Sequence, residues 1–481
     1  MPDDFIASSS MRKPAEDRTH IPVIDAAKWW QALNDEKLNS LIDRAVQANL
    51  DIEITLNRLQ EARTAEAVVL GLSLPEAGFI AGGGWGSGKD LSRSRASGPT
   101  YAGDDTTGLK QINYIVGFDA AWEIDLFGKY RRAREAARYD TESAIAARDA
   151  VLISVIADVA RAYVDLRGLQ TQLAVLRKNI EVTREYLNVV QQRFEHGITN
   201  ELDPTLARRQ LATLQAEEKP LTARIDATQY VIAVLLGQFP EDLARDLEKP
   251  GLIPQLPEKI QAGQPLDLLR RRPDIQEAER KVAGATARIG VATADLFPHV
   301  SLTAGAGYQV QGLGVNPNMT NFIWSFGPSV GWPLLDFGTL DALVDIADLR
   351  SRELFISYKQ TVLNAVREVD SSISTYTGQQ DRLRNLGEAL TASQRAISLA
   401  TQRYDRGLTD ALNVIDAERQ QYELEQQYVL TQTTAAQQFI ALYKALGGGW
   451  EEYQSFPPVR QPQPAVLAAF QRLLNSDKSQ K

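Results

Sequence analysis

The chain has no cysteine and only three histidines in 481 residues. The absence of cysteine excludes disulfides, thiolate metal sites and cysteine nucleophiles, and it is compatible with an oxidising compartment. His20, His196 and His299 are scattered, with neither metal-ligand spacing nor a catalytic dyad. We therefore expect no catalytic residue, no metal site, no cofactor and no enzymatic activity.

Long apolar runs are also missing. The nearest run, Val151 to Val164, contains Asp158 and Arg161, whereas a transmembrane helix needs about 20 predominantly apolar residues. A chain that crosses a membrane without such helices must use β-strands. The opening residues, MPDDFIASSSMRKPAED, lack the apolar core of a signal peptide, so export would require that this sequence is a mature or engineered form.

The charge balance argues against a general nucleic-acid partner, because the formal net charge is −9 and the pI is about 5.2. A local exception is a basic run of five residues between 129 and 138. These residues are Lys129, Arg131, Arg132, Arg134 and Arg138. They fall in a helical pattern, so we interpret them as a solvated helical face and expect no nucleic acid to bind.

The most informative stretch is Ile112 to Gly128, where every even position from 112 to 126 is apolar. Such alternation is typical of a strand with one apolar face. Its length exceeds the ~9–11 residues that a tilted strand needs to cross a bilayer. A helical pattern begins after Gly128. The stretch therefore predicts a membrane β-strand that leads directly into a helix.

The flanking residues supply the partners of this strand. Residues 76–86 form a weaker, glycine-rich strand pattern, and the polar stretch 87–111 predicts a long exposed hairpin loop between the two strands. From Gly128 to Gly197 there is no proline, which predicts a continuous helix over about 129–195, ~100 Å long. The turn at Gly197 then leads into an antiparallel helix over about 199–236.

The second half of the chain repeats the first. Pro298 to Gln309 matches Pro75 to Gly86 at a sequence offset of 223. An offset of 210 places Trp332 on Trp122, Gly338 on Gly128, Arg403 on Arg193 and Gly407 on Gly197. The two offsets differ because the second hairpin loop, near Gly312 to Asn321, is shorter. These matches predict an internal duplication of roughly 200 residues.

The duplication divides the chain into five segments. They are an N-terminal arm (1–35); a first repeat (36–237) with an initial helix, strands at about 76–86 and 112–126, a long helix at about 129–195 and a helix at about 199–236; a linker (238–265); a second repeat (266–447) with strands at about 299–310 and 322–334, a long helix at about 339–406 and a helix at about 409–446; and a C-terminal tail (448–481). Four strands cannot close a barrel, and an open sheet edge in lipid leaves backbone groups unsatisfied. Several chains must therefore share one barrel, and three would supply twelve strands.

Several motifs resemble those of one family. They are WEIDLFGKYRRAREAA (122–137), LLRRRPDIQEAE (268–279), GWPLLDFG (331–338), and the turns RFEHGITNELD and RYDRGLTDALNVIDAERQ. Together they resemble the TolC-like outer-membrane factors, in the branch of NodT-type efflux lipoproteins, over nearly the whole chain. Many members of that branch carry a lipidated N-terminal cysteine, which is absent here.

The resemblance implies a mixed α and membrane-β fold. Three copies would form a twelve-stranded β-barrel, with four strands per chain, in the bacterial outer membrane. A long periplasmic α-helical barrel would continue it, and the linker and tail would form an equatorial girdle. The implied function is the passive, gated channel of a tripartite efflux system that exports small molecules such as drugs. Its partners would be a periplasmic adaptor, an inner-membrane transporter and outer-membrane lipid.

The resemblance also assigns candidate sites near the hairpin turns. Leu412, Asn413 and Asp416 would form the periplasmic gate, with Asp416 contributing to a negative ring that favours cations; from the sequence alone, Asp416 is an exposed helical carboxylate. Asp203 and Tyr404 resemble a latch at the closed tip, although Asp203 could equally cap its own helix. The adaptor would contact the tips at Arg193, Gly197, Arg403 and Gly407, where glycine is also needed to turn the chain.

Two alternative functions stay open. The same duct could serve a type I protein-secretion system, or the chain could be a soluble coiled-coil scaffold without a pore. The alternating strands argue against the scaffold, because a soluble coiled coil has no use for strands with an exposed apolar face.

Overall fold

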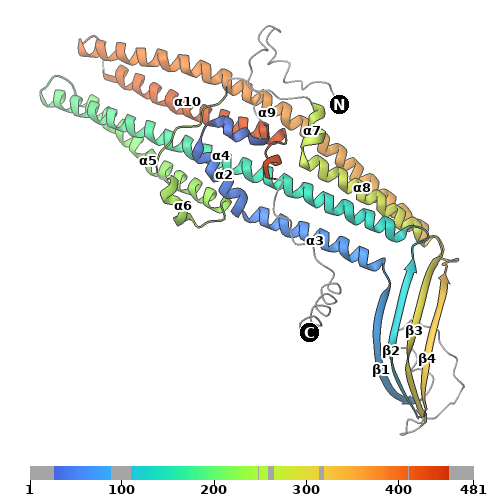
Figure 1. The fold of residues 1–481 in the computed structure, drawn as a ribbon. Helices are drawn as coiled ribbons and strands as arrows, with labels where there is room; N and C mark the ends of the chain where they lie inside the picture. Colours follow the sequence, from blue (N-terminus) through green and yellow to red (C-terminus); the bar gives the residue numbers. More distant parts are fainter. Residues whose placement is uncertain are drawn as a thin grey trace, which may run out of the picture. The chain divides into compact units, whose positions relative to one another are not determined.

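The computed structural model describes residues 26–87, 110–247, 249–257, 265–313, 319–409 and 411–453 (Figure 1). Most of the expected arm (1–35), most of the first expected hairpin loop (87–111), half of the second (312–321) and most of the expected tail (448–481) lie outside these ranges. The described residues divide into two units. The first contains residues 26–58, 145–277 and 359–453, and the second contains residues 59–144 and 278–358.

Strands and helices follow one another in the predicted order. The elements are η2 (Ala26–Leu33), α2 (Glu36–Ala48), α3 (Leu50–Leu72), β1 (Glu76–Ser87), β2 (Lys110–Ile124), α4 (Lys129–Glu195), α5 (Leu202–Leu235), α6 (Pro240–Leu247), α7 (Pro265–Arg271), α8 (Pro273–Ala294), β3 (His299–Leu313), β4 (Met319–Gly331), α9 (Thr339–Asp405), α10 (Ala411–Ala445) and η4 (Glu451–Tyr453). The helices α4 and α9 have 67 residues each, so the two ~100 Å helices are confirmed. Among the described helices, none is both long enough and apolar enough to span a bilayer.

The second unit contains an antiparallel sheet in the order β1-β2-β3-β4. Its register places Phe79 opposite Phe118, Phe118 opposite Ala306, and Ala306 opposite Trp324. Side chains alternate between the faces of a sheet, so the apolar positions of all four strands share one face. Phe79, Phe118 and Trp324 are exposed there. This arrangement confirms the predicted strand pattern.

The opposite face of the sheet carries small residues. One row across the four strands reads Gly78, Asp119, Gly305 and Ser325. In the adjacent row Gly117 pairs with Gly307, and a Cβ added to Gly117 would lie 2.7 Å from the carbonyl oxygen of Ala306. Glycine is therefore required at that crossing, because no side chain fits between the two backbones.

Two strand ends differ from the prediction. The second strand ends at Ile124, although alternation continues to Leu126, because the chain bends before the helix. The fourth strand spans Met319–Gly331 and not 322–334, so Pro333 lies outside it. Pro328 is inside the strand, opposite Leu302, and within the described residues β4 has a neighbouring strand on one side only.

Each junction between strand and helix uses a residue with positive φ. Gly128 has φ of +86° and Gly338 has φ of +82°. The preceding residue of the second junction, Phe337, also has a positive φ of 53° and is 96% exposed. Its equivalent in the first junction, Phe127, stacks on Phe297 with ring centroids 4.8 Å apart.

The internal duplication is confirmed by equivalent contacts. The indole nitrogen of Trp122 donates to the carbonyl of Ser73, and that of Trp332 donates to the carbonyl of Leu296, each at 3.1 Å. The two acceptors are related by the offset of 223 and the two donors by the offset of 210, as in the sequence. The two copies are therefore built from the same local geometry and not only from similar residues.

The same repeat appears in the first unit. Asn49 donates through its side chain to the carbonyl of Leu235 at 2.8 Å. Arg272 is equivalent to Asn49 at the offset of 223, and it donates to the carbonyl of Ala445 at 2.9 Å. Ala445 is equivalent to Leu235 at the offset of 210. The start of α3 thus meets the end of α5, and the start of α8 meets the end of α10, so the two contacts are related by the internal repeat.

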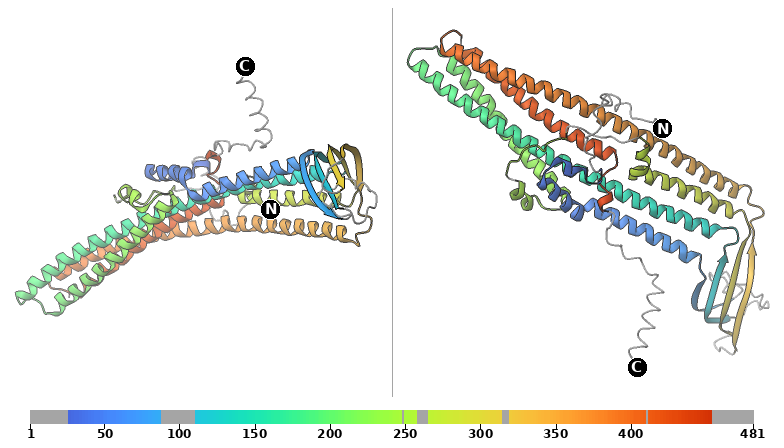
Figure 2. Two further views of the ribbon diagram at one scale, coloured as in Figure 1. Left: turned by 90° about the horizontal axis from the view of Figure 1, so that it is seen from below. Right: turned by 45° about the horizontal axis from the view of Figure 1, so that its top comes forward.

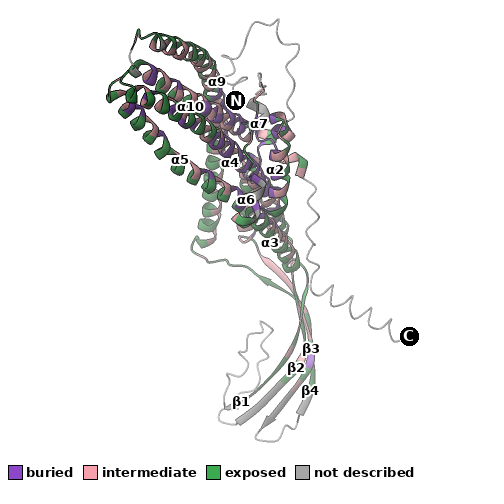
Figure 3. Ribbon diagram, turned by 90° about the vertical axis from the view of Figure 1, so that its left-hand side faces the viewer, coloured by how far each residue is buried: buried purple, intermediate pink, exposed green. Residues whose placement is uncertain are grey.

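The core of the first unit includes residues 26–33, which were predicted to belong to an N-terminal arm. Residues 26–33 form the 3₁₀ helix η2, in which Trp29 and Trp30 are almost fully buried. Trp29 stacks on Tyr443 with ring centroids 6.0 Å apart, and Trp30 stacks on Tyr453 at 6.3 Å. The arm prediction was therefore wrong for these residues, because two buried indoles anchor them. Figure 3 colours the chain by burial, and buried positions recur along α4 and α10.

The linker expected over 238–265 is partly helical. Helix α6 occupies Pro240–Leu247, and its Leu243 and Leu247 are buried. The carbonyl of Leu247 accepts from Gln170 of α4 at 3.1 Å, which fixes the linker against the long helix. The prolines that predicted a linker are therefore compatible with one short helix, since Pro240 stands at the first helical position.

Candidate functional site

The two hairpin tips of the first unit have the same backbone geometry. At the first tip Gly197 has φ of +71° and Ile198 donates to the carbonyl of Arg193 at 2.9 Å. At the second, Gly407 has φ of +69° and Leu408 donates to the carbonyl of Arg403 at 2.9 Å. Both turns are glycine C-caps in which the left-handed residue ends the helix. The predicted tip residues thus lie at the two turns, and Ile198 and Leu408 are exposed beside them.

Contacts between aromatic and charged side chains link the two hairpins. The guanidinium carbon of Arg193 on α4 lies 4.7 Å from the ring centroid of Tyr404 on α9. The Tyr404 ring also lies 6.4 Å from the ring of Tyr186. Burial raises the pKa of Tyr186, and so do the neighbouring Tyr404, Glu418 and Asp203. A cation above an aromatic ring contributes about 0.5–2 kcal/mol, so this contact holds α4 and α9 together near their ends.

The proposed latch residues have separate partners within the chain. Asp203, in the first turn of α5, accepts a hydrogen bond from the hydroxyl of Thr199, four residues earlier. Tyr404 lies beneath Arg193, as described above. The Tyr404 ring contacts the Tyr186 ring, and the charge of Asp203 is among the causes that raise the pKa of Tyr186. Asp203 and Tyr404 therefore both act on Tyr186, a residue that the sequence interpretation missed.

The candidate gate lies on the first turns of α10. Leu412 is 55% exposed, and Asn413 donates through its side chain to the Thr409 hydroxyl at 2.5 Å. Asp416 pairs with Arg419 at 2.8 Å and accepts from Gln420 at 2.7 Å. Asp416 is therefore not a bare negative charge, because a cation three residues later neutralises it within the helix.

Two further residues of α10 were missed by the sequence reading. Arg419 bridges Asp416 and Glu423, at 2.8 and 3.0 Å; the spacing of i, i+3 and i+4 in DAERQQYE could have revealed it. Glu418 could not be found in this way. Burial raises the pKa of its carboxyl from 4.5 to about 7, and burial of one position on a long helix depends on which helices pack against it.

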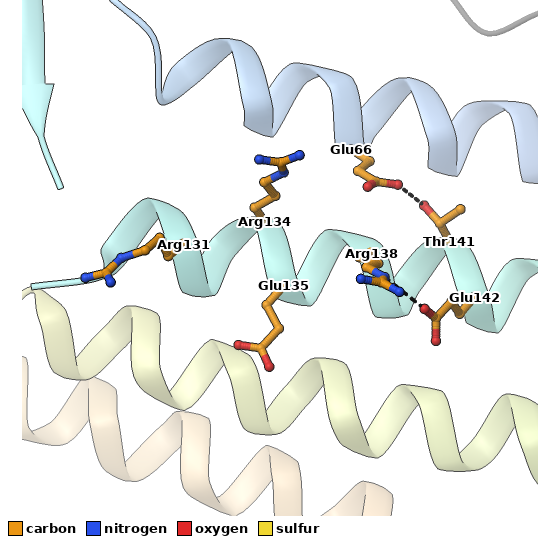
Figure 4. A pocket seen from close by; sticks show the side chains of 7 residues that line it. All are labelled: Glu66, Arg131, Arg134, Glu135, Arg138, Thr141 and Glu142. Carbon is orange, nitrogen blue, oxygen red and sulfur yellow. Dashed lines mark hydrogen bonds and ion pairs between the residues drawn. The ribbon is translucent and has the colours of Figure 1, made fainter.

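Acidic side chains of the second unit form ion pairs with the basic run at the start of α4. Figure 4 shows a cleft lined by residues of α3 and α4, namely Glu66, Arg131, Arg134, Glu135, Arg138, Thr141 and Glu142. Arg138 pairs with Glu142 at 3.1 Å, and Thr141 donates to Glu66 at 3.1 Å. Arg132 pairs with Glu135 at 2.6 Å. The run is thus a mixed-charge helix surface.

The described part of the chain holds no group of three or more His, Asp or Glu residues that could bind a metal ion. His299 contacts Glu123 at 3.1 Å, and Tyr130 donates to the same carboxylate at 3.0 Å. These contacts tie the base of the sheet to the start of α4.

Comparison with known proteins gives consistent results. The family model described as "Outer membrane efflux protein" matches residues 41–238 and 265–448. The toluene efflux pump outer membrane protein TtgI of Pseudomonas putida is 31% identical, with 88% of this chain and 87% of the relative covered. Nodulation protein T of Rhizobium leguminosarum bv. trifolii is 28% identical, with 89% of each chain covered.

Solved structures share the fold. The outer-membrane channel OprN superimposes with a TM-score of 0.82 at 33% identity, over 94% of this chain and 97% of that chain. The outer membrane protein VceC from Vibrio cholerae superimposes with a TM-score of 0.76 at 25% identity, over 88% of this chain and 99% of that chain.

Proposed function

This chain belongs to the outer membrane efflux protein family and is an outer-membrane efflux channel, and on that premise we propose that it is the passive exit duct of a three-component pump. One observation carries the proposal: a four-stranded sheet with an apolar face is joined through single glycines to helices of 67 residues. A membrane pore and a ~100 Å extension are thereby parts of one chain.

The open edges of the sheet support a homotrimer. Within the described residues, β1 and β4 each pair with a strand on one side only. An unpaired edge in lipid is costly, because no water can satisfy its N–H and C=O groups. Three copies would join their edges into a closed barrel of twelve strands, continued by an α-helical barrel in the periplasm.

The hairpin tips provide the surface for a periplasmic adaptor. Ile198 and Leu408 are 73% and 63% exposed, next to the two glycine turns. Exposed apolar side chains on rigid turns are suited to pack against another protein's helices. We assign the adaptor contact to the tips at Arg193, Gly197, Arg403 and Gly407, and the inner-membrane transporter acts through the adaptor and supplies the energy.

The cargo would be small organic molecules. Relatives are named for the efflux of toluene, solvents and antibiotics, which favours this class over the protein-secretion alternative. In the trimer, Leu412 would form an apolar constriction at the gate, and the Asp416–Arg419 pairs would surround it. Asp203 and Tyr404 would hold the tips in the closed state.

Mass measurement and conductance test this function together. The detergent-solubilised protein is expected to be a trimer, and in planar bilayers it should show a small, cation-selective conductance. Replacing Asp416 or Asp203 by Ala should increase the conductance, because each change removes a carboxylate that positions the closed tip. A stable soluble monomer would contradict the proposal that the protein forms a trimeric exit duct.

The control variant is Glu423→Ala. It removes the other carboxylate bound to Arg419 but leaves Asp416 in place, so conductance should stay close to that of the unmodified protein. If Asp416→Ala and Glu423→Ala change the conductance equally, Asp416 is not a gate residue. The effect would then come from the loss of a carboxylate paired with Arg419.

A further inference from the structure

The cleft between α3 and α4 has the size and the lining of a site for a charged ligand. Its volume is about 610 Å³, within the ~300–1,000 Å³ of small-molecule sites. All its lining residues belong to the second unit. Three arginines and three glutamates line it together with the Thr141 hydroxyl. A ligand that carries charged groups would therefore be recognised better there than an apolar one.

Most charges of this cleft are already paired within the chain. The pairs are Arg131 with Asp125, Arg138 with Glu142, and Glu135 with Arg132, at 3.3, 3.1 and 2.6 Å. Each of these pairs lies on α4 or on the turn before it, so they keep the surface of the helix neutral. They leave little net charge there to attract an ion.

Two charges of opposite sign are not paired in this way. Within the part of the chain that the structure describes, the Arg134 guanidinium has no hydrogen-bond or ion-pair partner. The Glu66 carboxylate accepts only from the Thr141 hydroxyl, at 3.1 Å. Figure 4 shows Arg134 extending from α4 toward α3, and Glu66 extending from α3 toward α4. The cleft thus presents a separate cation and a separate anion to an incoming molecule.

The internal repeat shows that the fold does not require these two charges. The offset of 210 places Val344 at the position of Arg134, and the offset of 223 places Ile289 at the position of Glu66. The second repeat therefore builds its helices with apolar residues at both positions. Arg134 is also unfavourable for its own helix, because it lies near the positive end of the helix dipole. A partner outside the chain would explain why both charges are present.

The position along the chain indicates where that partner would be found. The apolar strand β2 ends at Ile124 and α4 begins at Lys129. Arg134 follows the start of α4 by ~8 Å, and the headgroup layer on each side of a bilayer is ~5–8 Å thick. The long side chain of arginine can extend toward that layer. The cleft therefore lies at the depth of the lipid headgroups on the periplasmic side of the outer membrane.

A zwitterionic phosphoethanolamine headgroup matches the two charges. Its phosphate oxygens can accept from the planar fork of a guanidinium. Its ammonium, a few bonds away, can donate to a carboxylate. An anionic headgroup without an ammonium would place a negative group beside Glu66 and leave that carboxylate unpaired. The cleft should therefore distinguish the zwitterionic lipid from an anionic one.

We propose that the cleft between α3 and α4 binds the headgroup of phosphatidylethanolamine, with its phosphate on Arg134 and its ammonium on Glu66. Thr141 acts as a positioning residue, since its hydroxyl donates to Glu66. This site rests on the outer-membrane location of the channel and is independent of the gate and adaptor assignments.

Native mass spectrometry of the full chain in detergent tests the site. The protein is titrated with phosphatidylethanolamine and, separately, with phosphatidylglycerol, and the unmodified protein should retain the former in preference. Arg134→Gln should weaken the binding of both lipids by about tenfold, because each loses a charge-assisted hydrogen bond to its phosphate. Glu66→Gln should weaken phosphatidylethanolamine alone and abolish the preference. Glutamine can still accept from Thr141, so the cleft should keep its shape.

The matched control is Arg132→Gln. It makes the same change of charge on the same turn of α4, but Arg132 packs against Gly290 of α8 and does not line the cleft. Its lipid binding should equal that of the unmodified protein. Unfolding temperatures measured without added lipid would show that each variant is folded.

Three results would overturn the site. Equal loss of lipid in Arg132→Gln and Arg134→Gln would mean that binding follows net charge alone. An unchanged preference in Glu66→Gln would mean that the ammonium does not meet this carboxylate. Retention of soluble glycerophosphoethanolamine without retention of the lipid would exclude a membrane lipid as the source. Trimer mass and conductance are measured separately, so none of these results would bear on the exit duct.

Discussion

At the scale of single residues, Glu418 is the group whose charge should respond to neutral pH. Its carboxyl has a pKa of about 7, raised by burial from 4.5. A raised pKa means that the folded state binds the proton more tightly than the unfolded state. The stability from this residue is therefore complete below pH 4.5 and is lost as pH rises through 7.

Replacing Glu418 by Gln tests this linkage. The variant cannot lose a proton, so it should become more stable than the unmodified protein above pH 7, by up to roughly 3 kcal/mol at pH 8. Thermal unfolding midpoints at pH 6 and pH 8 would measure the difference. Glu423→Gln is the control, because Glu423 is exposed on the same helix, and its pH profile should follow that of the unmodified protein.

At this scale the sequence predicted where the hairpin turns lie, but it did not predict the ion pairs and buried titratable groups near them. Gly197 and Gly407 were found because a turn between two helices needs a residue that tolerates positive φ. The pairing of Asp416 with Arg419 is predictable from their spacing of three residues on a helix. The burial of Glu418 and Tyr186 could not be read, because both depend on which long helices pack together near the tip.

At the scale of elements, the turn at Gly407 has a matched internal control. Gly407 has φ of +69° and Gly387, inside α9, is helical; nothing lies within 4 Å of a Cβ added to either. Gly407→Ala should destabilise the hairpin by about 1 kcal/mol, because only backbone strain is added. Gly387→Ala should stabilise α9 by a similar amount. Thermal unfolding midpoints that move in the same direction for both variants would contradict this account.

Element type was predictable and element ends were less so. The helices α4 and α9 were predicted within one residue, because no proline interrupts either pattern between strong helix-stopping signals. β2 ends two residues earlier than its alternation, since the chain at Asp125 to Phe127 turns to start α4, and Asp125 accepts from the backbone of Arg131 at 2.9 Å. Apolar alternation continues through such a bend, so periodicity alone could not reveal it.

At the scale of the whole molecule, membrane assembly should depend on one face of the sheet. Phe326 lies on the apolar face and is 69% exposed, and Ser325 points to the opposite face. Phe326→Lys should reduce the amount of protein in the outer membrane, since a lysine facing the centre of the lipid costs about 2–4 kcal/mol. Ser325→Lys should assemble in near-normal amounts. Equal loss in both variants would contradict the assignment of faces.

The sequence also predicted why one copy is insufficient, because four strands leave two edges open. It could not predict which residues meet across those edges. Those contacts depend on how the side chains of neighbouring copies pack, and periodicity assigns a residue to a face but not to a partner.

The glycine-rich face of the sheet affects how a passing molecule would be handled. The row of Gly78, Asp119, Gly305 and Ser325 presents backbone, one carboxylate and one hydroxyl to that side of the sheet. This row has no bulky side chain that could form a shaped binding site for a solute. The choice of cargo would then be made before a molecule reaches the duct, and one duct could serve chemically unrelated compounds.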